Sequence, residues 1–242
     1  MSSNAAPERD SPSLGSEEAP PDLSVVTTDE EGSRAGRWRW RTPAGLYRLI
    51  STPVLRAVLG WDLPRWDVRW VPEGSGTCLE VGSGGGFYTG PLARHLPSSG
   101  TLLSLERHRG SLVALRSRLA DRPGPTLRQV CGDGTRLPLA SGSVDVVFLG
   151  YCLEEMPDPY HAVTEAHRVL RPGGRLVVFL WRPAITRKRR DPVLARMHEL
   201  FDIKRERFGP QNIRLCLRRP DVERDLAHAS PVGLTAGAAG RG

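Results

Sequence analysis

Short apolar runs alternate with amphipathic segments through the middle of the chain. Five runs rich in leucine or β-branched residues are bounded by turn residues, and each predicts a β-strand. They span 77–81, 101–105, 126–131, 144–149 and 174–181. Between them, apolar residues recur at helical spacing over 109–120 and 158–170, which predicts two helices. Repeated strand–helix–strand units indicate a parallel sheet with helices on both faces.

The flanking regions complete this pattern. Residues 191–202 predict a helix, and 203–208 and 212–217 predict a pair of closing strands. Ahead of the core, 43–60 predicts a helix that Pro53 kinks or divides. The expected fold class is α/β: a Rossmann-like, doubly wound, mostly parallel sheet of about seven strands with an N-terminal helical lead-in.

Composition divides the chain into four expected segments. Residues 1–36 are rich in Ser, Pro and acids and are predicted to be disordered. Residues 37–72 contain five of the six tryptophans and are predicted to be a helical lead-in or lid. Residues 73–220 form the predicted ligand-binding core, and 221–242 a loose C-terminal tail.

Charge is unevenly distributed in this 242-residue chain of net charge +7. Residues 1–35 hold eight acids and two arginines, a net charge of −6, which leaves +13 for the rest. Such a balance can attract nucleic acid or an anionic membrane face. The basic residues are mostly dispersed, however, so we favour an arginine-rich, solvated surface.

The distribution of cysteines and apolar residues bears on location. The four cysteines and six histidines are scattered without a C-x-x-C pair. We therefore expect reduced thiols and no metal site. The apolar run at 176–181 is far shorter than the roughly 20 residues of a membrane span, and the N-terminus lacks a secretory pattern. These features favour a cytoplasmic location.

The most informative segment is CLEVGSGGGFYTG, residues 78–90. Glu80 lies in the first predicted strand, and glycines follow at positions 82, 84 and 86. Glycine allows unusual backbone angles and a close approach by a ligand. Phe87 stands where the dinucleotide fingerprint needs Gly or Ala, so an NAD site is not expected. The structural alternative is a plain turn from strand to helix.

Two more acidic residues follow predicted strands. Glu106 ends the second and can accept hydrogen bonds from both hydroxyls of a ribose. The alternative is an acid that merely begins a helix. Asp133, between Gly132 and Gly134, follows the third strand. An acid at that place can accept a hydrogen bond from an adenine amino group.

Four elements in this order resemble one family. Glu80-x-Gly-x-Gly-x-Gly, GDG-x-x-LP-L at 132–139, S-x-D-V-V-F at 143–148 and LRPGGRL at 170–176 resemble the class I S-adenosylmethionine (SAM)-dependent methyltransferases. They fit the broad group that includes the ubiquinone/menaquinone C-methyltransferases. The resemblance implies SAM as cofactor and a SAM-binding methyltransferase domain over 73–220. The cofactor-binding residues that we infer from it are Glu80, Gly82, Ser83, Gly84, Gly86, Glu106, Arg107, Gly132, Asp133, Gly134 and Tyr151.

The resemblance also implies transfer of the sulfonium methyl group to a small-molecule acceptor. The tryptophan-rich lead-in favours an apolar or aromatic acceptor, methylated at carbon or oxygen, with peripheral membrane contact if the acceptor is lipophilic. Tyr151 and Tyr88 are candidates for the acceptor side, and no general base is assigned. Two alternatives stay open: a nucleic-acid-directed methyltransferase, and a SAM-binding protein without catalysis. Nucleic acid is the less favoured partner because no Asn/Asp-Pro-Pro-Tyr loop follows the fourth strand. The oligomeric state is not predicted.

Overall fold

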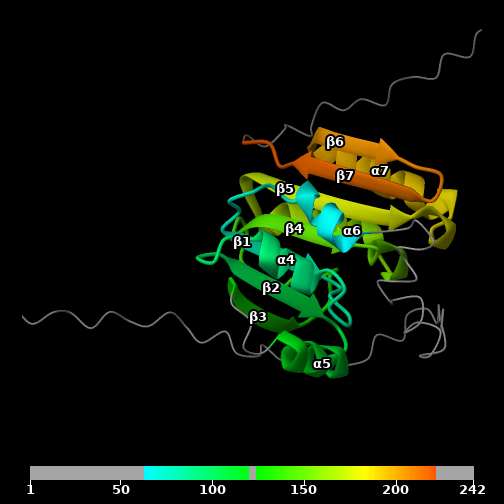
Figure 1. The fold of residues 1–242 in the computed structure, drawn as a ribbon. Helices are drawn as coiled ribbons and strands as arrows, with labels where there is room; N and C mark the ends of the chain where they lie inside the picture. The colour runs from blue at the N-terminus through cyan, green and yellow to red at the C-terminus, as the bar shows by residue number, and fades with distance from the viewer. Residues whose placement is uncertain (1–62, 120–123, 222–242) are drawn as a thin grey trace, which may run out of the picture.

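The computed structural model describes residues 63–119 and 124–221; the helix predicted at 43–60 and the segment predicted at 1–36 lie outside the described residues. Seven strands form one sheet in the order β3-β2-β1-β4-β5-β7-β6 (Figure 1). All neighbouring strands are parallel except that β7 is antiparallel to both β5 and β6. The predicted seven-stranded, mostly parallel sheet is confirmed. The strands are β1 Thr77–Val81, β2 Thr101–Glu106, β3 Thr126–Cys131, β4 Val144–Gly150, β5 Leu170–Trp181, β6 Asp202–Phe208 and β7 Asn212–Arg218.

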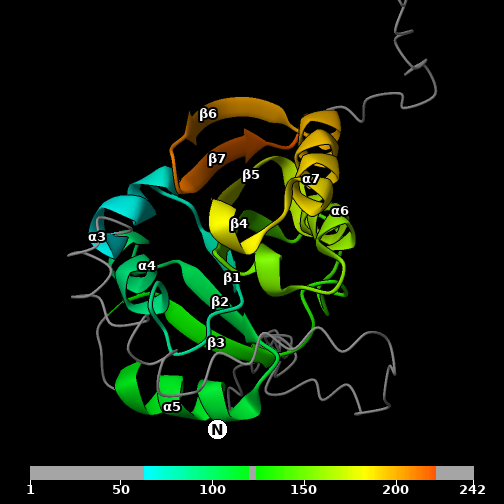
Figure 2. The ribbon, with the colours of Figure 1, turned by 90° about the vertical axis from the view of Figure 1, so that its right-hand side faces the viewer.

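Helices cover both faces of the sheet, as the strand–helix alternation predicted (Figure 2). One face carries α3 Pro64–Asp67, the 3-10 turn η1 Val68–Trp70, α4 Thr89–His95 and α5 Arg109–Leu119. The other carries α6 Pro159–Val169 and α7 Arg187–Leu200, which pack on each other. Two further 3-10 turns, η2 Leu153–Glu155 and η3 Arg182–Ala184, follow the carboxyl ends of β4 and β5.

The alternation of side chains along the strands divides the core into two layers. In β1, Leu79 and Val81 join the cluster beneath α6 and α7, whereas Cys78 joins the cluster beneath α4. Strands β4 and β5 follow the same rule, so both faces of the central strands are buried. A sheet buried on both faces explains why these strands are nearly continuous apolar runs in the sequence.

Two element boundaries differ from the sequence expectation by four residues. Helix α7 begins at Arg187, four residues before the predicted start, and continues through Pro192. Strand β5 begins at Leu170 rather than at residue 174 because Leu170 pairs with Val144 before a bulge in the ladder. The LRPGGRL motif at 170–176 therefore lies within β5.

Asp145 gives the fourth-strand motif a structural role. Its Oδ2 accepts hydrogen bonds from the backbone N–H groups of Gly76 (2.7 Å) and Thr77 (2.8 Å), and its Oδ1 pairs with Arg171 at 2.9 Å. A Cβ atom on Gly76 would lie 2.9 Å from that Oδ2. Asp145 therefore ties the amino ends of β1 and β4 together, at the edge of the sheet opposite the glycine loop.

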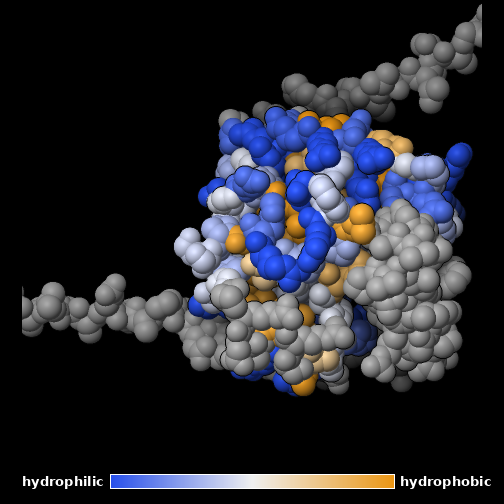
Figure 3. Space-filling view, in the orientation of Figure 1, coloured by the Kyte–Doolittle hydropathy of each residue, from blue (hydrophilic) through white to orange (hydrophobic). Residues whose placement is uncertain are grey.

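Two further observations concern the hydropathy of the visible surface and of the helices. On the side seen in Figure 3, hydrophilic residues predominate where Figure 1 places β6, and hydrophobic residues are scattered. Within 63–119 and 124–221, the helices are all too short or too polar to cross a bilayer.

Candidate functional site

The carboxyl ends of β1, β2, β3 and β4 meet at one edge of the sheet because these four strands are parallel neighbours. Hydrogen bonds join these strand ends in pairs. The Gly82 N–H donates to the Leu105 carbonyl at 2.8 Å, which links β1 to β2. The Gly132 N–H donates to the Glu106 carbonyl at 3.2 Å, and the Cys152 thiol donates to the Val81 carbonyl at 3.2 Å. Loops far apart in sequence are thus brought to one place.

The loop after β1 requires its glycines for two separate reasons. Gly82, Gly84 and Gly86 have φ values of 73°, 48° and 85°, in the left-handed region that side chains disfavour. Space is also short: a Cβ atom on Gly82 would lie 2.7 Å from Cys152 Cβ, and one on Gly86 would lie 2.3 Å from Leu115 Cδ1. These glycines therefore allow close packing against the protein's own side chains, and the close approach by a ligand stays a prediction.

The amide groups of this loop are largely used within the protein. Those of Gly82 and Ser83 donate to Leu105, that of Gly86 donates to Ser83, and that of Gly84 donates to the Glu106 side chain. A phosphate-binding loop instead directs several such amides at its ligand. The loop geometry thus agrees with the failed dinucleotide fingerprint.

Glu106 is held at the tip of β2 with both oxygens oriented. Its Oε2 accepts from the Gly84 N–H at 2.8 Å, and its Oε1 accepts from the His108 N–H at 3.0 Å. The residue is only 8% exposed. Each carboxylate oxygen can accept a second hydrogen bond, so a diol can still be bound. The arrangement fits the predicted ribose contact.

Glu80 is a buried carboxyl directly beneath the glycine loop. It is 3% exposed and accepts a hydrogen bond of 2.6 Å from the Thr89 hydroxyl, in the first turn of α4. Burial raises the pKa of Glu80 to about 7; the Thr89 hydrogen bond opposes this rise, and the charge of Glu106 adds to it. Near pH 7 this carboxyl is therefore partly protonated.

Asp133 begins a hydrogen-bonded turn after β3. Its Oδ1 accepts from both the N–H (2.8 Å) and the hydroxyl (2.9 Å) of Thr135, and its carbonyl accepts from the Arg136 N–H at 3.0 Å. Its Oδ2 accepts no hydrogen bond from residues 63–119 or 124–221. A Cβ atom on Gly134 would lie 2.8 Å from Met156 Cε and 2.9 Å from Val81 Cγ1, so the turn packs closely against β1.

Tyr151 follows β4 and has φ 57°, the one non-glycine residue in the described ranges with a positive φ. Its N–H donates to the Phe179 carbonyl at 3.0 Å, and its half-buried ring lies 5.8 Å from the Phe179 ring. A bulky side chain in this conformation is strained, and such strain is concentrated at functional sites. The structure places Tyr151 at the edge of the sheet where the predicted cofactor residues gather.

Tyr88 has a different environment. It is 4% exposed, its hydroxyl donates to Asp67 Oδ2 at 3.2 Å, and its ring packs on Phe148 and Phe179 at centroid distances of 5.0 and 6.0 Å. Asp67 also pairs with Arg214 of β7 at 3.2 Å. These contacts give Tyr88 a packing role, and its catalytic role stays a prediction.

Two other predicted cofactor residues have distinct surroundings. Arg107 has an exposed side chain, and its carbonyl accepts from the Cys131 thiol at 3.6 Å. Ser83 is 4% exposed, and its hydroxyl is buried without a hydrogen-bond partner. A buried hydroxyl of this kind, in a loop beside two carboxyl groups, fits a ligand that carries both donors and acceptors. The hydrogen-bond acceptors at this edge therefore fit SAM, whose ribose hydroxyl, ammonium and adenine amino groups are donors.

Several residues at this site were missed by sequence reasoning. Cys152 packs against Gly82, Thr89 holds Glu80, and Met156 packs against Gly134. Their sequence separations follow no periodicity, so no local signal identifies them. Glu154, in the turn η2 after β4, is 6% exposed and accepts a hydrogen bond from the Trp181 N–H. Among residues 63–119 and 124–221, no cluster of three His, Cys, Asp or Glu side chains could hold a metal ion.

Comparison with known proteins agrees with this geometry. Residues 79–178 match the protein-family model described as "Methyltransferase domain". The chain is 32% identical over 99 residues to a demethylmenaquinone methyltransferase of Lactococcus lactis, a match that covers 41% of this chain and 39% of the relative. It is 39% identical over 99 residues to a malonyl-[acyl-carrier protein] O-methyltransferase of Methylococcus capsulatus, covering 40% of this chain and 34% of the relative. The chain thus spans well under half of the length of these two relatives.

The fold has a close counterpart among solved structures. A SAM-dependent methyltransferase from Aquifex aeolicus superposes with a TM-score of 0.56 at 16% identity, over 69% of this chain and 98% of that one. This likeness concerns the arrangement of strands and helices. Together with the family match, it bears out the resemblance noted for the motifs between residues 77 and 181.

Proposed function

We propose that this protein, whose residues 79–178 form a class I methyltransferase domain, binds SAM and transfers its methyl group to a small molecule. One observation carries the proposal: the glycine loop, Glu106 and Asp133, separated by up to 51 positions in sequence, lie at one edge of the sheet. The Gly84–Glu106 hydrogen bond joins the first two of them directly.

Each group at this edge has a proposed task. Glu106 accepts hydrogen bonds from the ribose hydroxyls, and Asp133 accepts one from the adenine amino group through its available Oδ2. The glycine loop lies beneath the amino-acid portion, with Ser83 and Glu80 near the ammonium group. The bound sulfonium supplies an activated methyl group, whose bond to sulfur breaks as a bond to the acceptor nucleophile forms. The chain's own residues then contribute alignment, which can lower a barrier by about 7–11 kcal/mol.

The acceptor is proposed to be a small apolar or aromatic molecule, methylated at carbon or oxygen. Tyr151 lies beside an aromatic cluster that includes Tyr88, Phe148 and Phe179, and aromatic side chains favour apolar and planar ligands. The two curated relatives are named for demethylmenaquinone and for malonyl-[acyl-carrier protein]. These names support an organic acceptor. A cytoplasmic location stays a prediction from the sequence.

The direct test is calorimetry of the full chain with SAM and S-adenosylhomocysteine, followed by incubation with radiolabelled SAM and a panel of phenols, quinols and carboxylic acids. We expect 1:1 binding and label transfer to one of these classes. Absence of binding at millimolar ligand removes the proposal. Binding without transfer to any acceptor supports the non-catalytic alternative. Transfer to nucleic acid, with steeply salt-dependent binding, supports the other alternative.

A further inference from the structure

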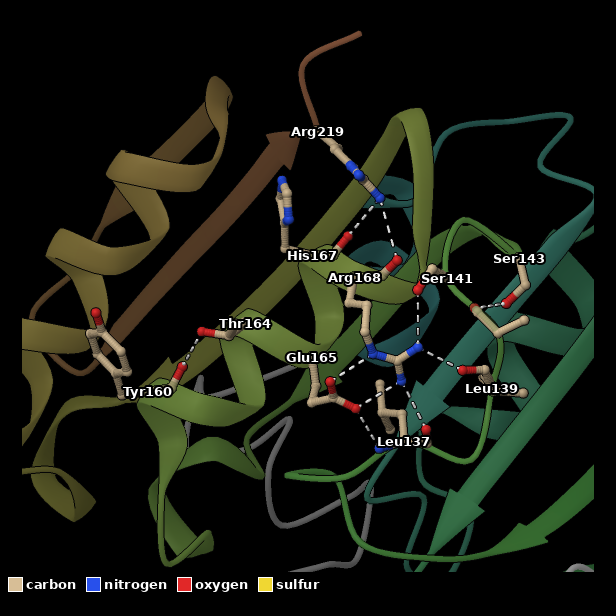
Figure 4. Close-up of polar contacts among 11 residues, drawn as sticks. Leu137, Leu139, Ser141, Ser143, Tyr160, Thr164, Glu165, His167, Arg168 and Arg219 are labelled. Carbon is tan, nitrogen blue, oxygen red and sulfur yellow. Dashed lines mark hydrogen bonds and ion pairs between the residues drawn. The ribbon is translucent and has the colours of Figure 1, made fainter. Parts of the chain in front are cut away.

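Arg168, on α6, connects that helix to the loop between β3 and β4 (Figure 4). Its guanidinium donates to the carbonyls of Leu137 (3.0 Å) and Leu139 (2.8 Å) and to the Ser141 hydroxyl (3.4 Å). A guanidinium offers five donors in a rigid plane, so one side chain fixes several backbone positions at once.

Glu165 completes the arrangement one turn earlier on α6. Its two oxygens receive Arg168 Nε at 2.7 Å and Nη2 at 2.8 Å, a bidentate pair, and its Oε2 also accepts from the Leu137 N–H at 2.9 Å. The pair lowers the pKa of Glu165 and raises that of Arg168, so both are charged at neutral pH. Both backbone polar groups of Leu137 are therefore held by one ion pair (Figure 4).

Leu137 is directly joined to the turn that presents Asp133. The Asp133 carbonyl accepts from the Arg136 N–H, and its Oδ1 accepts from Thr135, so residues 133–136 form one hydrogen-bonded unit that ends at Leu137. Leu137 itself is 4% exposed in the core. The direction of the available Asp133 Oδ2 thus depends on where Leu137 is fixed.

We propose that the Glu165–Arg168 pair positions Asp133 for recognition of the adenine amino group, acting through Leu137. Neither residue touches the ligand; both are positioning residues. The inference rests on the proposed function, since it concerns the same SAM site. Helix α6 lies on the face of the sheet opposite α4, the helix that follows the glycine loop. The inference gives α6 a role in selecting the adenine group of the ligand.

The test compares two ligands by calorimetry: S-adenosylhomocysteine and its analogue with hydrogen in place of the adenine amino group. Loss of one hydrogen bond to a charged acceptor should weaken wild-type binding by about tenfold to a hundredfold. In Arg168→Met this preference should fall by about tenfold, because Asp133 no longer has a fixed direction. Arg168→Lys is a second variant, for use if Arg168→Met does not fold. It keeps the charge but not the planar fork of donors, so we expect the same fall in ligand preference.

Arg219→Met is the matched control. Arg219 also donates to backbone carbonyls near the end of α6, those of His167 at 3.0 Å and Arg168 at 3.3 Å (Figure 4) and that of Leu170. The hydrogen bonds to the loop at 137–141 come instead from Arg168 and Glu165. We expect a comparable loss of melting temperature with an unchanged ligand preference. This control separates a general loss of stability from a loss of adenine recognition.

The outcomes distinguish this inference from the proposed function. If the wild type binds neither ligand, the proposed function fails. If the wild type prefers the parent ligand and the Arg168 variants keep that preference while losing stability like Arg219→Met, the positioning role is overturned. Equal binding of both ligands by the wild type also overturns it, because Asp133 then does not recognise the amino group.

Discussion

The backbone N–H of Gly84 donates to Glu106 Oε2 at 2.8 Å, so the glycine loop after β1 is fixed by the acid at the end of β2. This contact makes the two motifs one structural unit. A change at Glu106 therefore acts on the proposed ribose contact and on the conformation of the glycine loop together.

We predict that Glu106→Ala lowers SAM affinity by about tenfold to a few hundredfold, because two charge-assisted hydrogen bonds to the ribose are lost. Glu106→Gln should lose less, since the amide oxygen still accepts one bond. Calorimetry measures both affinities, with circular dichroism as a check of folding. An alanine variant that folds and binds SAM as well as the wild type would exclude Glu106 from the site.

The raised pKa of Glu80 leads us to expect that the free energy of unfolding depends on pH. Its pKa is raised from 4.5 to about 7 on folding, so the folded state binds more protons than the unfolded state between these values. The free energy of unfolding should therefore fall as pH rises from about 4.5, by at most about 3 kcal/mol, and level off above about pH 8.

The matched variant is Glu80→Gln, which does not titrate but keeps an oxygen to accept from the Thr89 hydroxyl. Urea denaturation of the ligand-free protein across this pH range should give a flatter profile for the variant. Parallel profiles for the two proteins would show that Glu80 does not titrate as its burial implies.

Gly82→Ala should lower the free energy of unfolding by about 2–4 kcal/mol. A side chain at φ 73° is strained, and its Cβ would lie 2.7 Å from Cys152 Cβ. Adding Cys152→Gly relieves the collision but not the backbone strain, so the double variant should recover only part of the loss. Gly110→Ala is the control, since nothing lies within 4 Å of that Cβ position in α5. A loss at Gly110 as large as that at Gly82 contradicts this account.

Tyr151→Phe keeps the ring that packs beside Phe179 and removes only the hydroxyl. If that hydroxyl orients the acceptor, the rate of methyl transfer should fall about twofold to tenfold with unchanged SAM affinity. Tyr88→Phe is the matched comparison: it should cost about 1.5–3 kcal/mol of stability, because the hydroxyl donates to the buried Asp67 carboxyl group, and a fall in its rate as well would support the predicted role of Tyr88 on the acceptor side. Equal rates for Tyr151→Phe and the wild type remove the Tyr151 hydroxyl from the acceptor site.

The elements with clear periodicity were predictable from the sequence. Strand β1 has the predicted limits, and α6 differs from its predicted limits by one residue at each end, because burial on one or both faces imposes a regular pattern. The start of α7 was not predictable in this way: only Val193, Met197 and Leu200 are buried there, and the first turn is entirely polar. A helix boundary without apolar positions has no periodic signal.

For the site, the sequence identified the residues that follow strands but not their supporting contacts. Parallel strands bring Gly82, Glu106 and Asp133 together by topology alone, so their proximity followed from strand order. The Thr89–Glu80 and Cys152–Gly82 contacts depend on side-chain packing between elements, which no spacing rule contains. The Glu165–Arg168 pair lies at i and i+3 on one helix and could have been found, but its hold on Leu137 spans 28 positions.

The strand order has a consequence for how the protein is made. Among the described strands, β6 pairs with β7 alone, and β7 also lies against β5, so β6 joins the sheet only after β7 has been synthesised. Arg214 of β7 also pairs with Asp67, which receives the Tyr88 hydroxyl next to the glycine loop. A chain emerging from the ribosome therefore exposes unpaired edges of β5 and β6 until residues 212–218 are available. We expect nascent chains that stop before residue 212 to be retained by chaperones, and the arrival of the last strand to release them.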